Sequence, residues 1–307
     1  MSTTPEQMSD SMTVLLATDG SDCAGVAVDL VRAIGWPPGS VIHVVTVVEH
    51  AQLADVSVEG GHEAAESGSA SVNDGARAEL DRAARSLDET GARIETAVLT
   101  GRPGSAIVDK ATAIRADLIV VGSRGHGTIG SMVLGSVSAE VADHAPCPVL
   151  VARRHWWRRA LLAVDGSPFA LAAEKIVIGW PIFAQLPIEV ASVGDTDMSW
   201  TSGLALSGYA GAIDYPTTTK EIISEHEQVA AESAERLNAA GRKANGEVLQ
   251  GDPATELLHR ATETSADVIV MGTHGRTGVR RLLAGSVARN VMLHASCSVL
   301  VVREVRR

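Results

Sequence analysis

Two glycine-rich segments of the chain have the composition and spacing to hold a phosphate group. Both contain Gly-x-x-Gly followed, after nine further residues, by Gly-Ser: Gly122, Gly125, Gly135 and Ser136, then Gly272, Gly275, Gly285 and Ser286. Glycine lets a main chain approach an anion closely. If a helix begins at each Gly-Ser, its free N–H groups, its dipole and the serine hydroxyl all favour the same anion. The doubled pattern therefore predicts two phosphate-binding bends.

Acidic and apolar residues are expected to gather at these bends. An Asp-Gly-Ser sequence follows a short apolar run in each half of the chain, at Asp19 and at Asp165. In open parallel sheets, ligands bind beyond the carboxyl ends of the strands, where Val47 and Val193 are expected to close the second strand of each half. A carboxylate facing such a pocket suits a ribose hydroxyl or a metal ion carried by the phosphates.

The chain consists of two copies of one unit. Residues 116–153 and 266–303 align without a gap and agree at 17 of 38 positions. A chain of 307 residues also suits two domains of about 150 residues each. We predict a first domain over 12–152, a linker over 153–159 and a second domain over 160–304.

Short aliphatic runs alternate with amphipathic segments in both copies. The strands are expected at 13–18, 40–48, 93–99, 117–121, 147–152, 160–164, 188–193, 243–249, 267–271 and 297–302. The helices are expected at 22–34, 72–90, 103–115, from Gly135-Ser136 onward, and at 169–179, 219–240, 253–264 and 285–294. Segments 50–70 and 194–218 are predicted to be loops. The alternation indicates an α/β fold of two tandem, doubly wound, Rossmann-like domains, each a five-stranded parallel sheet with helices on both faces.

Charge and hydropathy exclude some partners. The net charge of −11 argues against a protein that grips nucleic acid by its phosphates. Residues 1–11 lack the basic start of a signal peptide, and no apolar run approaches the ~18–20 residues of a membrane helix. We expect a cytoplasmic protein with no membrane insertion.

The cysteines and two repeated histidines are expected to be structural. The odd number of three cysteines argues against a disulfide framework, and their spacing matches no metal site. Cys147 and Cys297 open matching aliphatic strands and are expected to be buried as small hydrophobic residues. His144 and His294 precede those strands and are expected to cap a helix or join the core, since no metal-ligand spacing surrounds them.

The segment 153–159 has the sequence RRHWWRR, in which cations flank two tryptophans. This composition could contact nucleic acid or a membrane. Between two well-formed domains, we favour a linker whose tryptophan rings pack on a domain surface.

The complete pattern resembles the universal stress protein family, in its nucleotide-binding branch and in a tandem two-domain form, over residues 12–304. The resemblance rests on the strand-Asp-Gly-Ser opening, on the glycine pattern and on a closing His-Ala-x-Cys-x-Val strand. It implies a fold like that of the adenine nucleotide alpha hydrolases, with the last strands of the domains, 147–152 and 297–302, meeting across a pseudo-two-fold axis. It also implies one ATP per domain, with Mg²⁺ carried by its phosphates. The implied nucleotide-binding residues are Ala17, Asp19, Val47, Val121, Gly122, Gly125, Gly135, Ser136 and Val137 in the first domain, and Ala163, Asp165, Val193, Met271, Gly272, Gly275, Gly285, Ser286 and Val287 in the second.

Several functions remain open from the sequence. The leading interpretation is a nucleotide-regulated stress or dormancy protein, and a slow ATPase or self-phosphorylating protein is an alternative, with loop residues His126, His274, Arg124 and Arg276 as helpers. A third is an interaction module whose glycines serve only turns, and cAMP could replace ATP. Arg280 and Arg281 could clamp phosphates or face solvent. The dinucleotide-like pattern from Gly125 to Gly130 is set aside because the second copy lacks it, and no GK[ST] phosphate loop occurs. A protein partner and a homodimer are left undetermined.

Overall fold

The structure is a computed structural model, and it describes residues 11–49, 61–125, 134–195, 219–275 and 285–303. Elements of the first half are β1 (Thr13–Ala17), α1 (Asp22–Ala33), β2 (Val41–Val48), α3 (Gly61–Leu87), η1 (Asp88–Thr90), β3 (Arg93–Thr100), α4 (Pro103–Ala113), β4 (Leu118–Gly122), α5 (Ser136–His144) and β5 (Val149–Ala152). Elements of the second half are β6 (Ala160–Ala163), α6 (Pro168–Gly179), η2 (Pro181–Phe183), β7 (Pro187–Gly194), α8 (Thr219–Ala239), β8 (Lys243–Gln250), α9 (Pro253–Glu263), β9 (Val268–Gly272), α10 (Ser286–His294) and β10 (Ser298–Val302).

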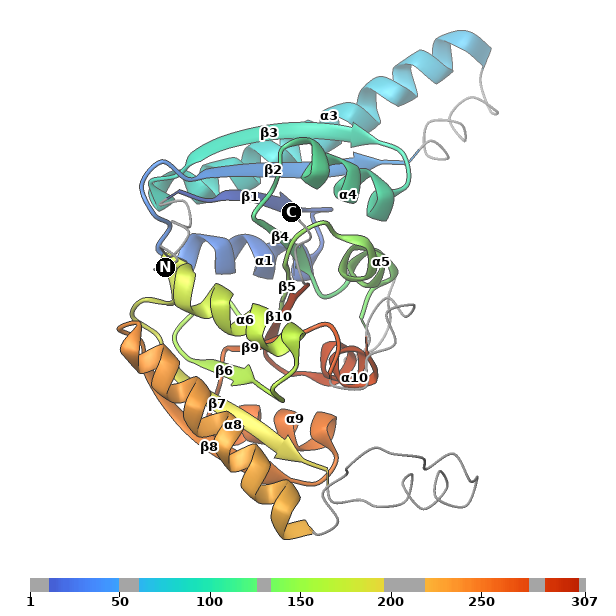
Figure 1. Ribbon diagram of the computed structural model, residues 1–307. Helices are drawn as coiled ribbons and strands as arrows, with labels where there is room; N and C mark the ends of the chain where they lie inside the picture. The colour runs from blue at the N-terminus through green and yellow to red at the C-terminus, as the bar shows by residue number, and fades with distance from the viewer. Residues whose placement is uncertain (1–10, 50–60, 126–133, 196–218, 276–284, 304–307) are drawn as a thin grey trace, which may run out of the picture.

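All ten strands form one sheet, with the order β3-β2-β1-β4-β5-β10-β9-β6-β7-β8 (Figure 1). Within each half every neighbouring pair is parallel, so the predicted α/β fold with two five-stranded halves is confirmed. The halves join through the antiparallel pair β5 and β10, where Leu150 lies opposite its repeat equivalent Leu300. The closing strands therefore meet about a pseudo-two-fold axis, as the resemblance implies.

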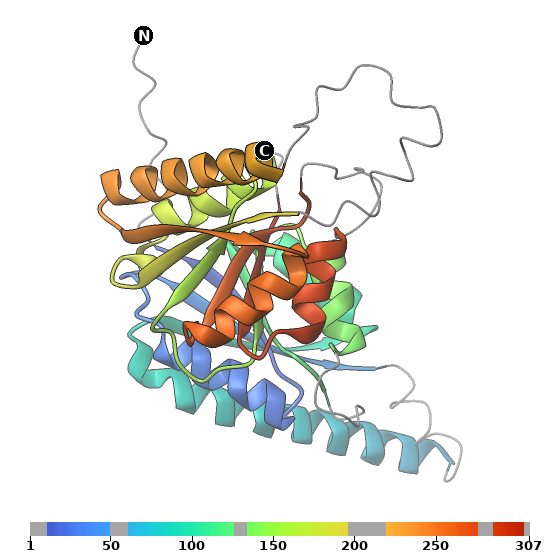
Figure 2. The ribbon, with the colours of Figure 1, turned by 90° about the horizontal axis from the view of Figure 1, so that it is seen from below.

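Helices cover both faces of this sheet and enclose two aliphatic cores. The helices α1, α3, α6 and α8 pack on one face, and α4, α5, α9 and α10 pack on the other (Figures 1 and 2). Side chains alternate along the buried strands, so Val14 and Leu16 enter the first core while Leu15 enters the second. Both cores run across the junction of the two halves. Burial of strands on both faces accounts for their Val-, Ile- and Leu-rich sequences.

Two arginines reinforce the junction reciprocally. Arg153 follows β5 and donates a hydrogen bond to the carbonyl oxygen of Met292, near the end of α10. Arg303 follows β10 and donates to the carbonyl oxygen of Asp143, near the end of α5. Each cation thus lies at the carboxyl end of a helix of the other half, where the helix dipole favours positive charge.

Two expectations for the chain are corrected. Residues 61–70, expected in a loop, belong to α3, which begins at Gly61 and ends at Leu87 rather than covering 72–90.

In the linker, Trp157 is buried and donates to the carbonyl oxygen of Ile182 at 3.1 Å, as expected for a packed ring. Trp156 is 42% exposed instead, and Arg158 lies over its ring. Packing on a domain surface thus holds for one of the two rings.

The two cysteines expected in the core are buried there. At about pH 8, iodoacetamide is expected to alkylate only Cys23 in the folded chain, because the thiolate is the reactive form. Burial raises the pKa of Cys147 to about 12 and that of Cys297 to about 11, whereas Cys23 is partly exposed. Peptide mass spectrometry should find one modified cysteine in the native chain and three in urea. Native alkylation of Cys147 or Cys297 would contradict their burial.

The raised pKa values of these two cysteines also determine how the free energy of unfolding changes with pH. Unfolding returns both buried thiols toward their ordinary pKa of 9.0. They therefore stabilise the fold fully below that pH, and this contribution is lost as the pH rises from 9 toward about 11 for Cys297 and about 12 for Cys147.

Candidate functional site

The predicted site residues of the first domain gather at the carboxyl ends of β1, β2 and β4. The chain leaves β1 at Ala17, and the Thr18 N–H continues the ladder by donating to the carbonyl oxygen of Val45 (2.9 Å). Asp19 follows, and its Oδ1 accepts a hydrogen bond from the N–H of Ser21 (3.0 Å), which holds the carboxylate at the turn. The second domain repeats this turn, with Asp165 Oδ1 accepting from the N–H of Ser167 (2.9 Å).

The hydroxyls of the same two serines begin the next helices. Ser21 Oγ accepts from the N–H of Ala24, and Ser167 Oγ accepts from the N–H of Ala170, both at 3.2 Å. Each is thus the N-cap of its helix, α1 or α6, and satisfies one of the free N–H groups there. The Asp-Gly-Ser sequence therefore combines a fixed carboxylate with a capped helix.

Gly122 and Gly272 close β4 and β9, as predicted, but their neighbours give them a packing role. A Cβ on Gly122 would lie 2.7 Å from the carbonyl oxygen of Cys23, in the backbone of α1. A Cβ on Gly272 would lie 2.6 Å from the carbonyl carbon of Phe169, in the backbone of α6. These two glycines allow a helix to approach a strand closely, which the pattern alone did not distinguish from approach to a phosphate.

The later glycines of each pattern lie at the bend itself. A Cβ on Gly125 would overlap Asp19 Oδ2, and a Cβ on Gly275 would lie 2.8 Å from Asp165 Oδ2. The structure therefore brings the carboxylate and the second glycine of the pattern together in both domains. The segment then closes on itself, because the Gly135 N–H donates to the carbonyl oxygen of Ser123 (2.8 Å). The N–H of Gly285 makes the matching bond to Thr273 (2.7 Å).

The helices that begin at these bends have open N-termini. Gly135 and Gly285 occupy the N-cap positions of α5 and α10, and among the described residues no side chain caps either helix. Ser136 and Ser286 are the first helical residues, and both are exposed. As far as the described residues show, both helices therefore keep N–H groups and the positive end of the dipole available to an anion, unlike α1 and α6.

Apolar residues named by the resemblance share one face of the sheet. All of them belong to the core beneath α4, α5, α9 and α10: Ala17, Val47, Val121, Val137, Ala163, Val193, Met271 and Val287. Val47 and Val193 each stand one residue before the end of their strand, since β2 ends at Val48 and β7 at Gly194. This arrangement gives an apolar wall next to the open helix ends.

Some predicted residues fall outside the described chain. These are His126, Arg276, Arg280, Arg281, nearly all of the segment 194–218, and the end of the set-aside pattern at Gly130. Among the described helpers, His274 Nδ1 lies 3.1 Å from Thr273 Oγ1, and its ring contacts Phe169. His144 is exposed at the end of α5, where its Nδ1 bonds the carbonyl oxygen of Glu140, as expected for a helix-capping residue.

Glu79 was not anticipated at the site. It lies on α3, where its Oε1 accepts from Thr18 Oγ1 (3.4 Å) and its carboxyl carbon lies 3.1 Å from where a Cβ on Gly20 would be. The second domain has Val229 at the matching position. No local signal marks Glu79, because only the packing of α3 brings it to the turn.

Known proteins share this duplicated unit. The model of the universal stress protein family matches residues 11–153 and again residues 157–303. The chain belongs to the universal stress protein family. Two copies of the family unit follow each other in this chain, in agreement with the repeat found in the sequence and with the two halves of the sheet.

Relatives in this family come from archaea and bacteria. A universal stress protein of Methanocaldococcus jannaschii is 34% identical over 152 residues, which cover 49% of this chain and 85% of that protein. One from Mycolicibacterium smegmatis is 30% identical over 229 residues, 71% of each chain. The crystal structure of a universal stress protein from Archaeoglobus fulgidus matches 95% of this chain and 98% of its own, with a TM-score of 0.67. At 20% identity that likeness shows the shared fold.

Two further observations concern the described residues alone. None of the described helices combines the length and the apolar character needed to cross a bilayer. In the same ranges, no group of three His, Cys, Asp or Glu side chains is arranged to hold a metal ion.

Proposed function

We propose that each domain binds one molecule of ATP together with Mg²⁺, and that nucleotide occupancy lets the chain act in a stress or dormancy response. The uncapped N-termini of α5 and α10, each beside a glycine bend and an aspartate, carry this proposal. A polyphosphate supplies the acceptors that those N–H groups lack. The family membership agrees with it, since universal stress proteins are named for such responses.

The residues present fit this ligand. In the first domain the N–H groups at Ser136 and Val137 would hold phosphate oxygens, and Gly125 would let the chain approach them. Asp19 would take a ribose hydroxyl or the magnesium ion, and the apolar wall including Val47 would take the adenine. Binding of ATP would make the state of the protein depend on the ATP concentration in the cell, and the residues of the chain would provide the specificity for the nucleotide.

Aspartate at the first position of α5 and α10 is expected to weaken ATP binding strongly. In a Ser136→Asp, Ser286→Asp variant, a carboxylate replaces the hydroxyl where phosphates would bind, and repulsion should weaken affinity by about 100-fold. The same charge at a helix N-terminus stabilises the helix, so the fold should persist. Titration calorimetry with Mg-ATP measures the affinity, and thermal unfolding without nucleotide checks the fold.

The matched control is Ser136→Ala with Ser286→Ala. It removes one hydroxyl from each site without adding charge, and the loss of a hydrogen bond to a charged phosphate costs about 1.5 kcal/mol at the low end, so affinity should fall only about tenfold. ATP binding that is unchanged in the aspartate variant would show that phosphates do not lie at these helices. Competition by ADP, AMP and cAMP in the same assay identifies the preferred nucleotide.

Phosphate release decides between a binding protein and an enzyme. Phosphoryl transfer needs a positioned nucleophile or water and groups that stabilise charge. We expect release of no more than one phosphate per bound ATP. Repeated turnover would instead support the slow ATPase.

A further inference from the structure

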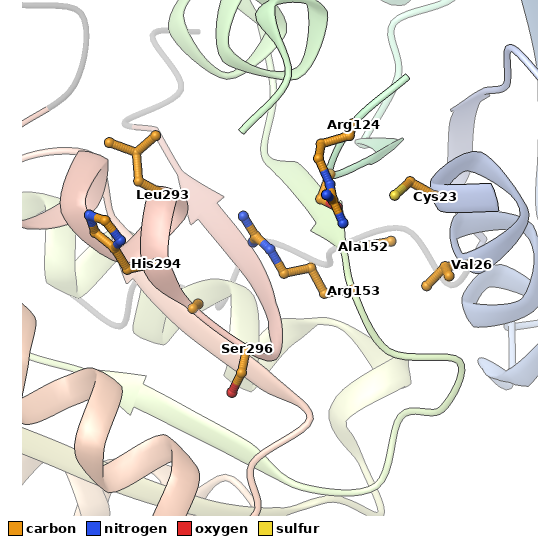
Figure 3. Close-up of a pocket in the computed structure, with 10 residues that line it drawn as sticks. Cys23, Val26, Arg124, Ala152, Arg153, Leu293, His294 and Ser296 are labelled. Carbon is orange, nitrogen blue, oxygen red and sulfur yellow. The ribbon is translucent and has the colours of Figure 1, made fainter. Parts of the chain in front are cut away.

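A cavity of about 330 Å³ lies between the two domains, beside the first glycine bend (Figure 3). Its walls are Cys23 of α1, Ser123 and Arg124 after β4, Arg153 after β5, and residues 293–296 at the end of α10 and just after it. This volume is at the small end of the range for ligand sites in proteins. None of the nucleotide-binding residues proposed above lines it.

The lining of this cavity is cationic. Arg124 and Arg153 contribute its positive charge, and neither aspartate nor glutamate is among the lining residues. Figure 3 shows Arg153 between Arg124 and Cys23 on one side and Leu293 and His294 on the other. The chain as a whole carries a net charge of −11, so this local excess of positive charge runs against the overall balance.

Arg153 is a partly buried cation that forms no ion pair with an acidic side chain of the described chain. Its Nη2 donates to the carbonyl oxygen of Met292, while its Nη1 is buried without a hydrogen-bond partner. Burial lowers the pKa of Arg153; among its neighbours Cys297 and Cys23 raise the pKa, and the charge of Arg124 lowers it. A buried charge that lacks a partner is costly, and an anion would compensate it.

The pseudo-symmetric arginine has a carboxylate near it, which Arg153 lacks. Arg303 reaches across the junction in the same way, and the carboxylate of Asp143 opposes the lowering of its pKa by burial. The residue that matches Asp143 in the second domain is Leu293. An internal carboxylate thus accompanies one arginine, and an apolar side chain accompanies the other.

The side chains at the pseudo-symmetric position, on the other side of the junction, also differ in size from those that line the cavity. Phe169 stands where the first domain has Cys23, and His274 stands where it has Arg124. The rings of Phe169 and His274 contact each other, with centroids 5.0 Å apart. The small thiol of Cys23 instead leaves room beside the two arginines.

We propose that this cavity binds a small molecule with two or more anionic oxygen groups, a phosphorylated or multiply carboxylated metabolite, between Arg124 and Arg153. The anion supplies the charge that Asp143 supplies on the other side. Ser123 and Arg124 continue into the first glycine bend. Binding of an anion in the cavity therefore changes the affinity of the neighbouring nucleotide site.

Cys23 provides a reporter within the cavity, because the other two thiols are buried. Citrate and inorganic phosphate, each tested separately at millimolar concentration, represent the two sources of anionic oxygen. The better ligand should slow alkylation of Cys23 by neutral iodoacetamide about tenfold in a saturable manner, as expected when a bound molecule covers a thiol. Calorimetry of the full-length chain gives the affinity independently.

Two variants that copy residues from the other side of the junction test the location. Leu293→Asp supplies an internal counter-charge, and Cys23→Phe fills the space, so both should abolish anion binding by calorimetry. Cys23→Ser keeps the volume and should bind as the wild type does. Thermal unfolding of each variant shows that its fold is retained, and Leu293→Asp should be at least as stable as the wild type.

Three results would overturn the proposal. The first is the absence of protection and of heat with both anions. The second is binding that survives in Leu293→Asp and in Cys23→Phe. The third is binding that disappears in Ser136→Asp with Ser286→Asp, because the anion would then occupy the glycine bends rather than this cavity. The third result would leave ATP binding at those bends untouched, so the two proposals fail separately.

Discussion

Replacing Gly122 with alanine is expected to lower the free energy of unfolding by about 3 kcal/mol, since overpacking a tight contact costs about 1–3 kcal/mol and more against rigid neighbours. The added Cβ would lie 2.7 Å from the carbonyl oxygen of Cys23 and 2.9 Å from the N of Ala24. Both atoms belong to the backbone of α1, which cannot rotate away as a side chain can. Urea unfolding followed by circular dichroism measures the change.

Gly25→Ala is the matched control, on the helix that Gly122 contacts. A Cβ there would meet nothing within 4 Å. Alanine is favoured over glycine inside a helix by about 1 kcal/mol, so this variant should be slightly more stable than the wild type. Equal stability of Gly122→Ala and the wild type would show that α1 and β4 do not approach as closely as described. The tight packing at Gly122 also explains why the serines, and not these glycines, are the right places to test ATP binding.

The second large effect is expected at an ion pair found only in the second domain, in which the carboxylate is buried and the arginine is partly exposed. Glu174 is 3% exposed on α6 and accepts hydrogen bonds from Arg236 Nε (2.6 Å) and Nη2 (3.0 Å) and from Ser233 Oγ (2.6 Å). Arg236→Ser should cost about 3 kcal/mol in urea unfolding, because it leaves a buried carboxylate without its cation. Serine is the residue at the matching position, Ser86, of the first domain.

The first domain also indicates which second substitution should restore the stability lost in Arg236→Ser. Val28 stands where the second domain has Glu174, so that position of the first domain has no buried charge. Glu174→Val combined with Arg236→Ser should therefore recover to within about 1 kcal/mol of the wild type, since an apolar replacement of a buried pair is often neutral. If the double variant is as unstable as Arg236→Ser, the loss comes from the packing of the arginine stem and not from the uncompensated carboxylate.

Local patterns were enough to predict most of the elements. The aliphatic runs before Asp19 and Asp165 could only be buried strands, and the Gly-Ser pairs at Gly135 and Gly285 do precede α5 and α10. The repeat itself indicated that both halves share one fold. Helix α3 was predicted too short because Gly and Ser between 61 and 70 have low helix propensity, although a helix already formed over the packed end of α3 extends cooperatively through them.

Interactions between distant residues could not be predicted from the sequence. Glu174 lies in a mostly apolar helix, and its partner Arg236 is 62 residues away. The role of Gly122 against α1 and the meeting of Arg153 with α10 likewise depend on tertiary packing. The pairing of β5 with β10 was expected from the resemblance to a family, not from spacing. At the site, the glycine pattern identified the bends, and Glu79 became visible only with the fold.

The antiparallel pairing of Leu150 with Leu300 limits how a bound molecule can alter this protein. Main-chain hydrogen bonds and two shared cores run through the middle of the molecule, so the halves cannot swing about a hinge without breaking them. We therefore expect a bound molecule to change the outer surface of the protein near each glycine bend, where a partner could contact it, and not the angle between the two halves.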